Sequence, residues 1–421
     1  MARPSPYLSK PPEKALLIGF YATKRESYHR KFSLEELARL AETAGAVVGE
    51  KQLHELRSPT PGTLIGSGKI DEIARDITLK GFDILILDED LAPTQQRNLE
   101  KALKVKVIDR TGLILDIFAR HARSSEGKIQ VELAQLSYLL PRLIGKGGEL
   151  SQLGGGIGTR GPGETQLEVD RRKAKERVSV LKQELKCVRT HRELHRDRRE
   201  KAPIATVAIV GYTNAGKSTL MNRLTHANVL VEDKLFATLD PTIRRLKLPS
   251  GRGVLLTDTV GFVRKLPHQL INAFRATFEE VASADLLIHL IDASHPDGVQ
   301  QAEVVEKVLG EMNLHHKTCL RVFNKADQAR ETEFFAGRPG DFFISALTGE
   351  GTDALLQTIE TSLSDSFRRL SLKLPYSAGS ELSLLYRTSR ILKRKDLSDA
   401  IYIEVELNDK YRNQFRRYIT L

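Results

Sequence analysis

The segment Gly211–Ser218 constrains the fold more than any other feature of this chain. It reads G-Y-T-N-A-G-K-S and matches G-x-x-x-x-G-K-[ST] at every fixed position. The apolar stretch Ile204–Val210 leads in, and Ser218–Leu224, with helical character, leads out. This strand–loop–helix context argues against a coincidental Gly-rich turn, because such a loop directs backbone N–H groups at phosphates from a helix N-terminus. The predicted phosphate site comprises Gly211, Tyr212, Thr213, Asn214, Ala215, Gly216, Lys217 and Ser218.

Within this loop, two side chains have predicted roles of their own. Lys217 is expected to contact the β- and γ-phosphates, and the Ser218 hydroxyl to bind Mg²⁺. A second motif, D-x-x-G, ends the apolar strand that begins at Leu255 and consists of Asp258, Thr259, Val260 and Gly261. A carboxylate there can hold Mg²⁺ through water, and Gly261 lets its N–H approach the γ-phosphate.

A threonine between these motifs is expected to complete the magnesium shell only while the γ-phosphate is present. Loss of that contact on hydrolysis would release the loop, which makes it a switch. The candidate segment is Phe236, Ala237, Thr238, Leu239 and Asp240. Thr242 is a rival to Thr238, and the spacing does not separate them.

Two more motifs select the base. The strand Cys319–Phe323 leads into N-K-x-D, formed by Asn324, Lys325, Ala326 and Asp327. The Asp327 carboxylate can accept from both N1–H and the 2-amino group of guanine, whereas adenine offers neither donor. After the strand Phe342–Ile344, the backbone N–H groups of Ser345, Ala346 and Leu347 can meet the guanine O6. GTP is therefore the predicted ligand.

These segments each follow a strand, so the fold class predicted for residues 201–367 is α/β, a doubly wound, mostly parallel sheet with its site at the strand C-termini. Many GTPases of this kind place a Gln directly after D-x-x-G to orient the attacking water. Here that position is Phe262, which has no hydrogen-bonding group. We therefore expect slow intrinsic turnover that a partner accelerates.

The rest of the chain is expected to form three further domains. Residues 1–110 contain predicted strands at Ala15–Phe20 and Asp83–Leu87, which alternate with predicted helices. One helix is expected to start at a capping box formed by Ser33 and Glu36, and another at Pro93. This alternation predicts a small parallel α/β domain. Residues 370–421 predict a small α+β domain with an alternating strand and Asn408 capping a short basic helix.

Residues 111–200 predict an antiparallel helical arm. Apolar residues recur at helical spacing in two runs, which are Ile129, Leu133, Leu136, Leu140 and Leu143, then Leu167, Ala174, Val178, Leu181, Leu185 and Val188. The connecting loop 145–164 contains nine glycines. Loops this long are usually functional or disordered.

The positive charge is concentrated on this arm. The chain carries a net charge of +11, and residues 171–201 hold thirteen Lys and Arg against five Asp and Glu. A solvated helix face would need more balanced pairing, so we favour contact with RNA phosphates. The slim Gly-rich tip suits close approach to a folded RNA surface, although a disordered linker is the alternative.

The remaining bulk features predict a soluble cytoplasmic protein, and a monomer is the expected state. The two cysteines, Cys187 and Cys319, are far apart and are expected to be reduced thiols. No apolar run is long enough for a signal peptide core or a membrane span. Association of the basic arm with a membrane surface is less favoured because the arm lacks an obvious amphipathic face rich in Trp, Phe and Leu. DNA is not an expected partner.

Taken together, these motifs resemble the HflX family of bacterial GTPases. The resemblance is carried by G-G-x-G-x-R-G-P-G-E at 155–164, G-Y-T-N-A-G-K-S at 211–218, F-A-T-L-D-P-T at 236–242, D-T-V-G-F at 258–262 and N-K-x-D at 324–327. It implies four domains (1–110, 111–200, 201–367 and 370–421), binding to the large ribosomal subunit and its rRNA, and a role in splitting or rescuing stalled ribosomes or in ribosome biogenesis.

For the site, the resemblance implies Thr238 as the switch threonine. Together with the motifs, this makes Ser218 and Thr238 the predicted Mg²⁺ ligands, and Lys217, Thr238 and Gly261 the predicted catalytic residues. It also implies that a Phe after D-x-x-G is normal for the group. Two functions remain in view: a GTPase whose nucleotide state controls ribosome association, and an RNA-binding ribosome assembly factor that uses nucleotide structurally. Unequal ribosome affinity in the GDP and GTP states would favour the first.

Overall fold

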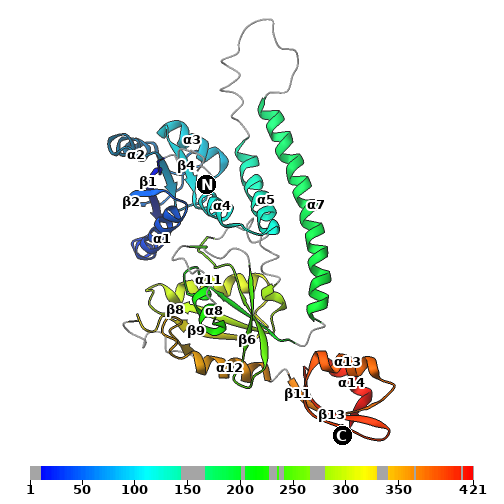
Figure 1. Ribbon diagram of the computed structural model, residues 1–421. Helices are drawn as coiled ribbons and strands as arrows, with labels where there is room; N and C mark the ends of the chain where they lie inside the picture. The colour runs from blue at the N-terminus through cyan, green and yellow to red at the C-terminus, as the bar shows by residue number, and fades with distance from the viewer. Residues whose placement is uncertain are drawn as a thin grey trace, which may run out of the picture. The chain divides into compact units, whose positions relative to one another are not determined.

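The computed structural model describes residues 11–143, 166–200, 204–226, 235–236, 241–265, 280–329, 340–364, 367–408 and 411–420 (Figure 1). Two compact units divide the chain. The first contains residues 1–185, 233–239 and 264–274, and the second contains residues 186–232, 240–263 and 275–421. The α/β class expected from the sequence is confirmed, and no described helix is both long and apolar enough to cross a membrane.

The N-terminal part of the first unit is a four-stranded parallel sheet in the order β2-β1-β3-β4. Its strands are β1 (Lys14–Tyr21), β2 (Val47–Glu55), β3 (Ile84–Leu87) and β4 (Lys106–Asp109). The helices are α1 (Lys24–Thr43), α2 (Ser67–Lys80), α3 (Pro93–Leu103) and α4 (Arg110–His121). All four residues of β3 are buried, as expected for a central parallel strand. Pro93 begins α3 as predicted.

The predicted capping box at Ser33 and Glu36 is wrong. Helix α1 begins nine residues earlier, where the Thr23 hydroxyl accepts from the Glu26 N–H at 3.4 Å. Ser33 is a buried residue inside the helix and donates to Asp88 at 2.7 Å. The S-x-x-E pattern places both polar side chains on one helix face, and a cap and an internal polar cluster look alike at that spacing.

The arm consists of α5 (Ser125–Arg142) and α7 (Gln166–Glu200). On α7, Leu181 and Leu185 are buried and the other described seam residues, Ala174, Val178 and Val188, are half-buried, in agreement with the predicted seam. The apolar residues of the α5 seam are only half-buried; its buried positions are Glu126, Gly127, Gln130, Val131, Ala134 and Tyr138. Helix α5 therefore has a second packing face, which the apolar pattern did not reveal.

This second face is anchored at the end of β4. The Tyr138 hydroxyl donates to Asp109 Oδ1 at 2.7 Å, and Arg142 donates to Asp109 Oδ2 at 3.0 Å and to the Leu91 carbonyl at 2.8 Å. The Arg142 guanidinium also stacks on the Tyr138 ring at 3.5 Å from its centroid. The side chains of α5 are thus fixed to the parallel sheet by charge-assisted hydrogen bonds as well as by packing. The Gly-rich loop 145–164 lies outside the described residues.

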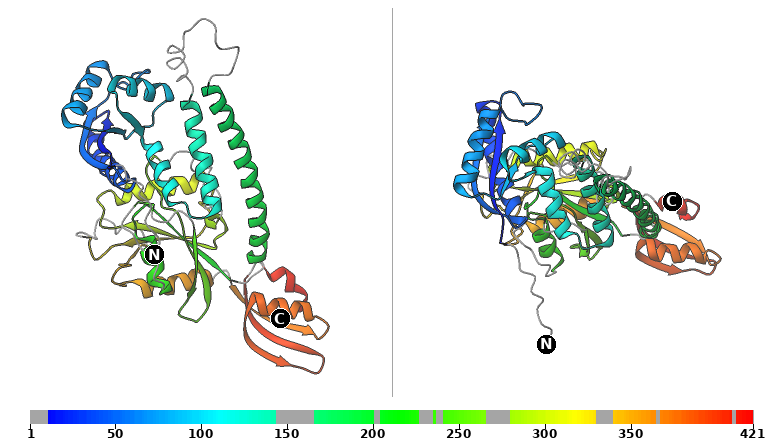
Figure 2. Two further views of the ribbon diagram at one scale, coloured as in Figure 1. Left: turned by 45° about the horizontal axis from the view of Figure 1, so that its top comes forward. Right: turned by 90° about the horizontal axis from the view of Figure 1, so that it is seen from above.

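The second unit contains a six-stranded sheet in the order β10-β9-β8-β5-β7-β6, in which only β6 is antiparallel. Its strands are β5 (Thr206–Gly211), β6 (Thr242–Lys247), β7 (Gly253–Asp258), β8 (Leu286–Asp292), β9 (Cys319–Asn324) and β10 (Phe342–Phe343). Helices α8 (Lys217–Thr225), α11 (Gly298–Glu311) and α12 (Thr352–Ser364) pack on it (Figure 2). The parallel strands bring their C-terminal ends to one edge.

The C-terminal domain is an antiparallel sheet in the order β12-β13-β11-β14. It comprises β11 (Phe367–Pro375), α13 (Gly379–Thr388), β12 (Ser389–Asp396), β13 (Ala400–Asn408), α14 (Arg412–Phe415), a short 3₁₀ turn and β14 (Ile419–Thr420). The predicted alternation on β13 is confirmed, with Ile401, Ile403, Val405 and Leu407 all buried. The predicted Asn408 cap is wrong, because β13 includes Asn408 and the cap of α14 is Tyr411.

Candidate nucleotide site

The phosphate loop connects the end of β5 to the start of α8, as its sequence context predicts. Gly216 has φ +90°, a conformation that L side chains rarely adopt, and a Cβ there would collide with the Asn324 amide nitrogen. Asn214 also has a positive φ, of 61°, and is exposed at the tip of the loop. The loop therefore depends on residue types that tolerate left-handed backbone.

Lys217 lies beneath the loop with only 7% of its surface exposed. Its Nζ donates to the carbonyl oxygens of Tyr212 at 2.7 Å and Gly211 at 3.2 Å. Burial lowers the pKa of Lys217 to about 8, although the nearby charge of Asp258 acts in the opposite direction. A cation held this way is available to the phosphates without first being ordered.

The magnesium ligands predicted from the two motifs meet in space. The Ser218 hydroxyl donates to Asp258 Oδ2 at 2.6 Å, across forty residues of sequence. Asp258 is buried at the end of β7, and the following Thr259 donates to the Ile209 carbonyl at 2.7 Å, which fixes the turn. A hydroxyl and a carboxylate oxygen are the hard ligands that Mg²⁺ accepts together with phosphate oxygens and water. The residues present fit this ion.

No group of three or more His, Cys, Asp or Glu among the described residues could hold a metal on its own.

Gly261 lies against Thr213 of the phosphate loop and against Lys217. A Cβ at this residue would lie 2.8 Å from Thr213 Cα and 2.9 Å from Lys217 Nζ. No side chain fits there without a shift of its neighbours, so this position requires glycine.

Phe262, which stands where many such GTPases have a Gln, has a structural role. Its ring is 1% exposed, its N–H donates to the Gly211 carbonyl at 3.1 Å, and its carbonyl accepts from the Thr213 N–H at 2.7 Å. These two bonds tie the segment after D-x-x-G to the beginning of the phosphate loop. Because the side chain packs in the core, it cannot orient a water molecule.

The base-binding motifs are joined through Asn324. Its amide donates to the Ala215 carbonyl at 2.8 Å and accepts from the Ala346 N–H at 2.9 Å, so one side chain links the phosphate loop to Ser345–Leu347. The Ala326 N–H donates to the Ile344 carbonyl at 3.1 Å. Asp327 is exposed and Leu347 is 65% exposed, which leaves both accessible to a base.

The sequence analysis missed Asp292, the last residue of β8. Lys325 Nζ donates to its Oδ2 at 2.6 Å, while its Oδ1 accepts from the Ser294 N–H at 2.9 Å and hydroxyl at 2.6 Å. This ion pair fixes the side chain of Lys325, the second residue of the N-K-x-D motif. Asp292 could have been found from the sequence, because it is an acidic residue that directly follows the apolar run Leu286–Ile291.

The switch segment is described only in part. Ala237, Thr238, Leu239 and Asp240 lie outside the described residues, so their predicted roles stay predictions. Phe236 is buried, with φ 61°, and packs edge-on against Phe118 of α4 at 4.6 Å between ring centroids. The rival Thr242 is the first residue of β6 and pairs with Asp258 in the sheet register.

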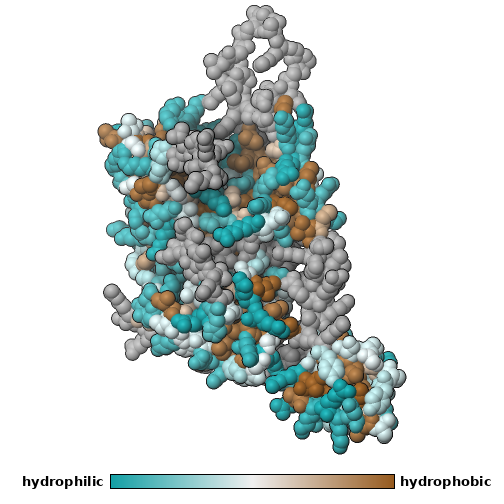
Figure 3. Space-filling model, in the orientation of Figure 1, coloured by the Kyte–Doolittle hydropathy of each residue, from teal (hydrophilic) through white to brown (hydrophobic). Residues whose placement is uncertain are grey.

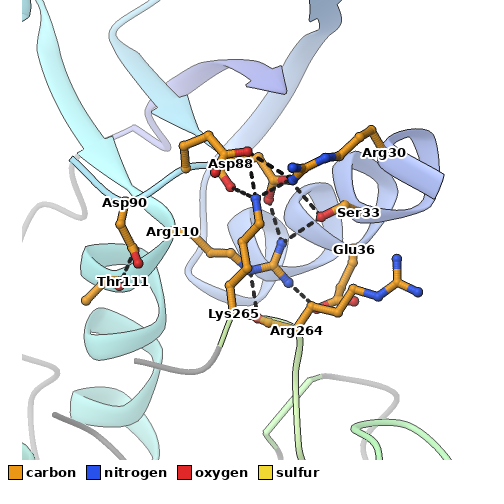
Figure 4. A network of polar contacts seen from close by, with 10 residues as sticks. Arg30, Ser33, Glu36, Asp88, Asp90, Arg110, Thr111, Arg264 and Lys265 are labelled. Atoms are coloured by element: carbon orange, nitrogen blue, oxygen red, sulfur yellow. Dashed lines mark hydrogen bonds and ion pairs between the residues drawn. The ribbon is translucent and has the colours of Figure 1, made fainter. Parts of the chain in front are cut away.

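A polar network in the first unit holds the segment that follows D-x-x-G (Figure 4). At its centre is Arg110, which is completely buried and donates to Asp88 Oδ1 at 2.6 Å, to Glu36, and to the Arg264 carbonyl at 3.2 Å. Lys265 donates to the Asp88 carbonyl and to Glu89 Oε1 at 2.9 Å.

The charges of this network are mutually compensating. Burial raises the pKa of the Asp88 carboxyl, but Arg110 and Lys265 outweigh it and keep the pKa below its ordinary value. The Ser33 hydroxyl satisfies the second carboxylate oxygen at 2.7 Å. Four segments that are distant in sequence thus share one ionised cluster, which no local pattern predicts.

Comparison with protein families agrees with this arrangement. Four family models match consecutive segments: GTP-binding GTPase N-terminal at residues 31–119, GTP-binding GTPase Middle Region at 121–199, 50S ribosome-binding GTPase at 206–325, and HflX C-terminal domain at 335–420. Together they span nearly the whole chain.

Two curated relatives are similar over nine-tenths or more of their length. The chain is 46% identical to GTPase HflX of Caldanaerobacter subterraneus subsp. tengcongensis over 98% of this chain and 95% of that protein. It is 42% identical to GTPase HflX of Escherichia coli over 90% of each. Among solved structures, a GTP-binding protein of Sulfolobus solfataricus in complex with GDP is 26% identical over 84% of this chain and 99% of that chain, with a TM-score of 0.43, which is too low to add to the argument.

The family expected from the motifs is therefore confirmed over four consecutive segments and by full-length relatives, and the chain belongs to the HflX family of GTPases.

Proposed function

We propose that this protein binds and hydrolyses GTP at the edge formed by the C-terminal ends of β5, β7, β9 and β10, and that it associates with the large ribosomal subunit to split or rescue stalled ribosomes. The observation that carries the GTPase assignment is the joining of the phosphate loop to the base-binding motifs through Asn324. The family model that matches residues 206–325 is described as a 50S ribosome-binding GTPase.

In this mechanism Lys217 neutralises the phosphate tail and the Gly261 N–H donates to the γ-phosphate. Ser218, and Thr238 in the switch, would hold Mg²⁺, which supplies charge neutralisation between the phosphates when it is bound. Asp327 selects guanine. The remaining predicted contacts come from the loop residues 211–218, the switch residues 236–240, Asp258–Gly261, Asn324–Asp327 and Ser345–Leu347.

Slow intrinsic turnover is part of the proposal. The buried Phe262 has no polar atom for the attacking water, so a partner is needed to order the switch or supply a polar group. Single-turnover hydrolysis should be slow for the protein by itself and faster when large subunits are added. An equally fast reaction without subunits would contradict this.

The arm is the proposed RNA contact. The described part of helix α7 presents exposed basic residues, including Arg171, Arg172, Lys173 and Lys175, and Figure 3 shows hydrophilic atoms at the upper end of this helix. One of its arginines, Arg177, is paired with Glu132 of α5 at 2.7 Å and serves the arm itself. A long helix in which positive charges outnumber negative ones can contact the phosphate backbone of a folded RNA.

Co-sedimentation with purified large subunits tests the function as a whole. We expect stronger association with a non-hydrolysable GTP analogue than with GDP, and weaker association when Arg171, Arg172, Lys173 and Lys175 are replaced by Gln. Arg171→Gln alone and Arg177→Gln form a matched pair, because each removes one positive charge from α7 and, of the two, only Arg177 is held in an ion pair with α5, so Arg177→Gln should weaken association less. Equal association in both nucleotide states would instead favour an assembly factor that uses nucleotide structurally.

A further inference from the structure

The C-terminal domain has an open sheet face opposite its helices. Its element order, β11-α13-β12-β13-α14-β14, with strand order β12-β13-β11-β14, is the β-α-β-β-α-β arrangement. Apolar residues of β11 and β13 pack with α13 and α14 through Leu385 and Phe415. None of the described helices covers the other face.

The strand register identifies the residues on this open face, because directly paired residues of antiparallel strands share a face. On β13 the open-face residues are Tyr402, Glu404 and Glu406, since their neighbours in sequence are buried. Tyr402 pairs with Lys373 of β11 on one side and Lys395 of β12 on the other. A half-buried aromatic ring is therefore flanked by two exposed lysines on adjacent strands.

The remaining positions of the face add positive charge. Glu404 lies between Lys393 and Ser371, and Glu406 lies between Arg390 and Arg369. The two acids are already compensated, Glu404 by Lys393 at 3.7 Å and Glu406 by an ion pair with Arg252 from the turn between β6 and β7.

The charge of the domain extends this pattern. Residues 367–421 contain twelve Lys and Arg against six Asp and Glu, an excess of six. The ion pair between Lys373 and Asp399 is exposed, so its lysine can exchange partners at little cost.

We propose that this face, defined as Arg369, Lys373, Arg390, Lys393, Lys395 and Tyr402, binds a single-stranded segment of RNA. A base stacks on the Tyr402 ring, and Lys373 and Lys395 contact the phosphates on either side of it. Open four-stranded sheets with aromatic residues on their central strands bind unpaired bases in this way.

RNA fits better than a protein partner. Protein interfaces are built around apolar and aromatic anchors surrounded by a rim, whereas this face carries one aromatic ring among charges. The inference rests on the proposed function, because it adds a second RNA contact to that of the arm.

The test uses the full-length protein and a fluorescein-labelled single-stranded RNA of about twelve nucleotides, a length that spans one such site. Fluorescence anisotropy gives the affinity at several salt concentrations. We expect Tyr402→Ala to weaken binding about tenfold and Tyr402→Phe to retain it, because stacking needs the ring and not the hydroxyl. Lys395→Gln should reduce the slope of log affinity against log salt by about 0.7.

Matched controls separate this face from general electrostatics. Tyr386→Ala removes an exposed tyrosine from α13, outside the open face, and should leave RNA binding unchanged. Binding of a fluorescent GTP analogue should be the same for all variants, since none of these residues contacts the nucleotide site, and thermal unfolding checks that each variant is folded at the assay temperature. RNA that contains 4-thiouridine should crosslink to the peptide that holds Tyr402.

The outcomes distinguish the two proposals. Loss of RNA binding in the arm variants with no effect of Tyr402→Ala would overturn this inference and leave the proposed function standing. Normal Tyr402-dependent RNA binding without any affinity for large subunits would overturn the proposed function instead. A photo-crosslinker at position 395 that captures a ribosomal protein rather than rRNA would also overturn the inference.

Discussion

Binding of GTP should take up a proton at Lys217. Burial holds the pKa of this ammonium at about 8 in the protein, and the phosphates of a bound nucleotide act to raise it. The protonated form therefore binds nucleotide much more tightly than the neutral form. The apparent affinity should be nearly constant below pH 7 and fall as the pH rises through 8, because a neutral Lys217 must first be protonated.

The magnitude follows from the single pKa. If only the protonated form binds, the affinity at pH 8 is about half its value at pH 6, and at pH 9 it is about tenfold lower. The number of protons taken up per GDP bound is about 0.5 at pH 8. Burial causes the lowered pKa of Lys217. The pH dependence of nucleotide affinity therefore depends on the phosphate loop that buries Lys217 and not on the overall charge of the protein.

Isothermal titration calorimetry of GDP binding in two buffers with different ionisation enthalpies measures this uptake directly. Lys217→Arg is the matched control, because a guanidinium stays charged throughout this range and should show no uptake at pH 8 even though it binds more weakly. Equal proton uptake by the variant and the natural protein would refute the assignment, since the proton would then belong to another group.

Three other substitutions test the site and the fold. Asp327→Asn should weaken GTP binding by about 1–3 kcal/mol in calorimetry by removing an acceptor for two guanine donors, and an unchanged affinity would contradict the guanine assignment. Arg110→Met leaves Asp88 buried without its main partner, so chemical denaturation should report about 3–5 kcal/mol less stability, whereas a loss below 1 kcal/mol would mean that the cluster is solvated. His289 is buried on β8, and burial lowers its pKa to about 3, so it stays neutral when folded but is protonated on unfolding below its ordinary pKa. Protonation of His289 on unfolding should therefore lower the free energy of unfolding by about 1.4 kcal/mol per pH unit as the pH drops below 6. In acid denaturation, His289→Leu should remove this contribution, which corresponds to one proton taken up on unfolding. An unchanged pH dependence in the variant would assign the proton to another group.

The sequence by itself predicted the segments of the proposed nucleotide site, because each part of that site is a short segment with strict local requirements. A phosphate loop needs glycines, a lysine and a hydroxyl at defined spacings between a strand and a helix. Parallel strands then bring the ends of β5, β7, β9 and β10 to one edge. The alternating apolar pattern of β13 was equally readable, since a half-buried antiparallel strand repeats every two residues.

Only the tertiary structure decided how polar residues far apart in sequence pair with one another. Ser33 and Glu36 match the sequence pattern of a capping box, yet their side chains belong to the polar cluster around Arg110. Phe262 looked like a missing catalytic group, and its backbone proved to hold the phosphate loop. The flanking of Tyr402 by two lysines also depends on strand register. The physical reason is common to all three: an ion pair or a cross-strand neighbour is set by the packing of distant segments, and one sequence contains no local signal for it.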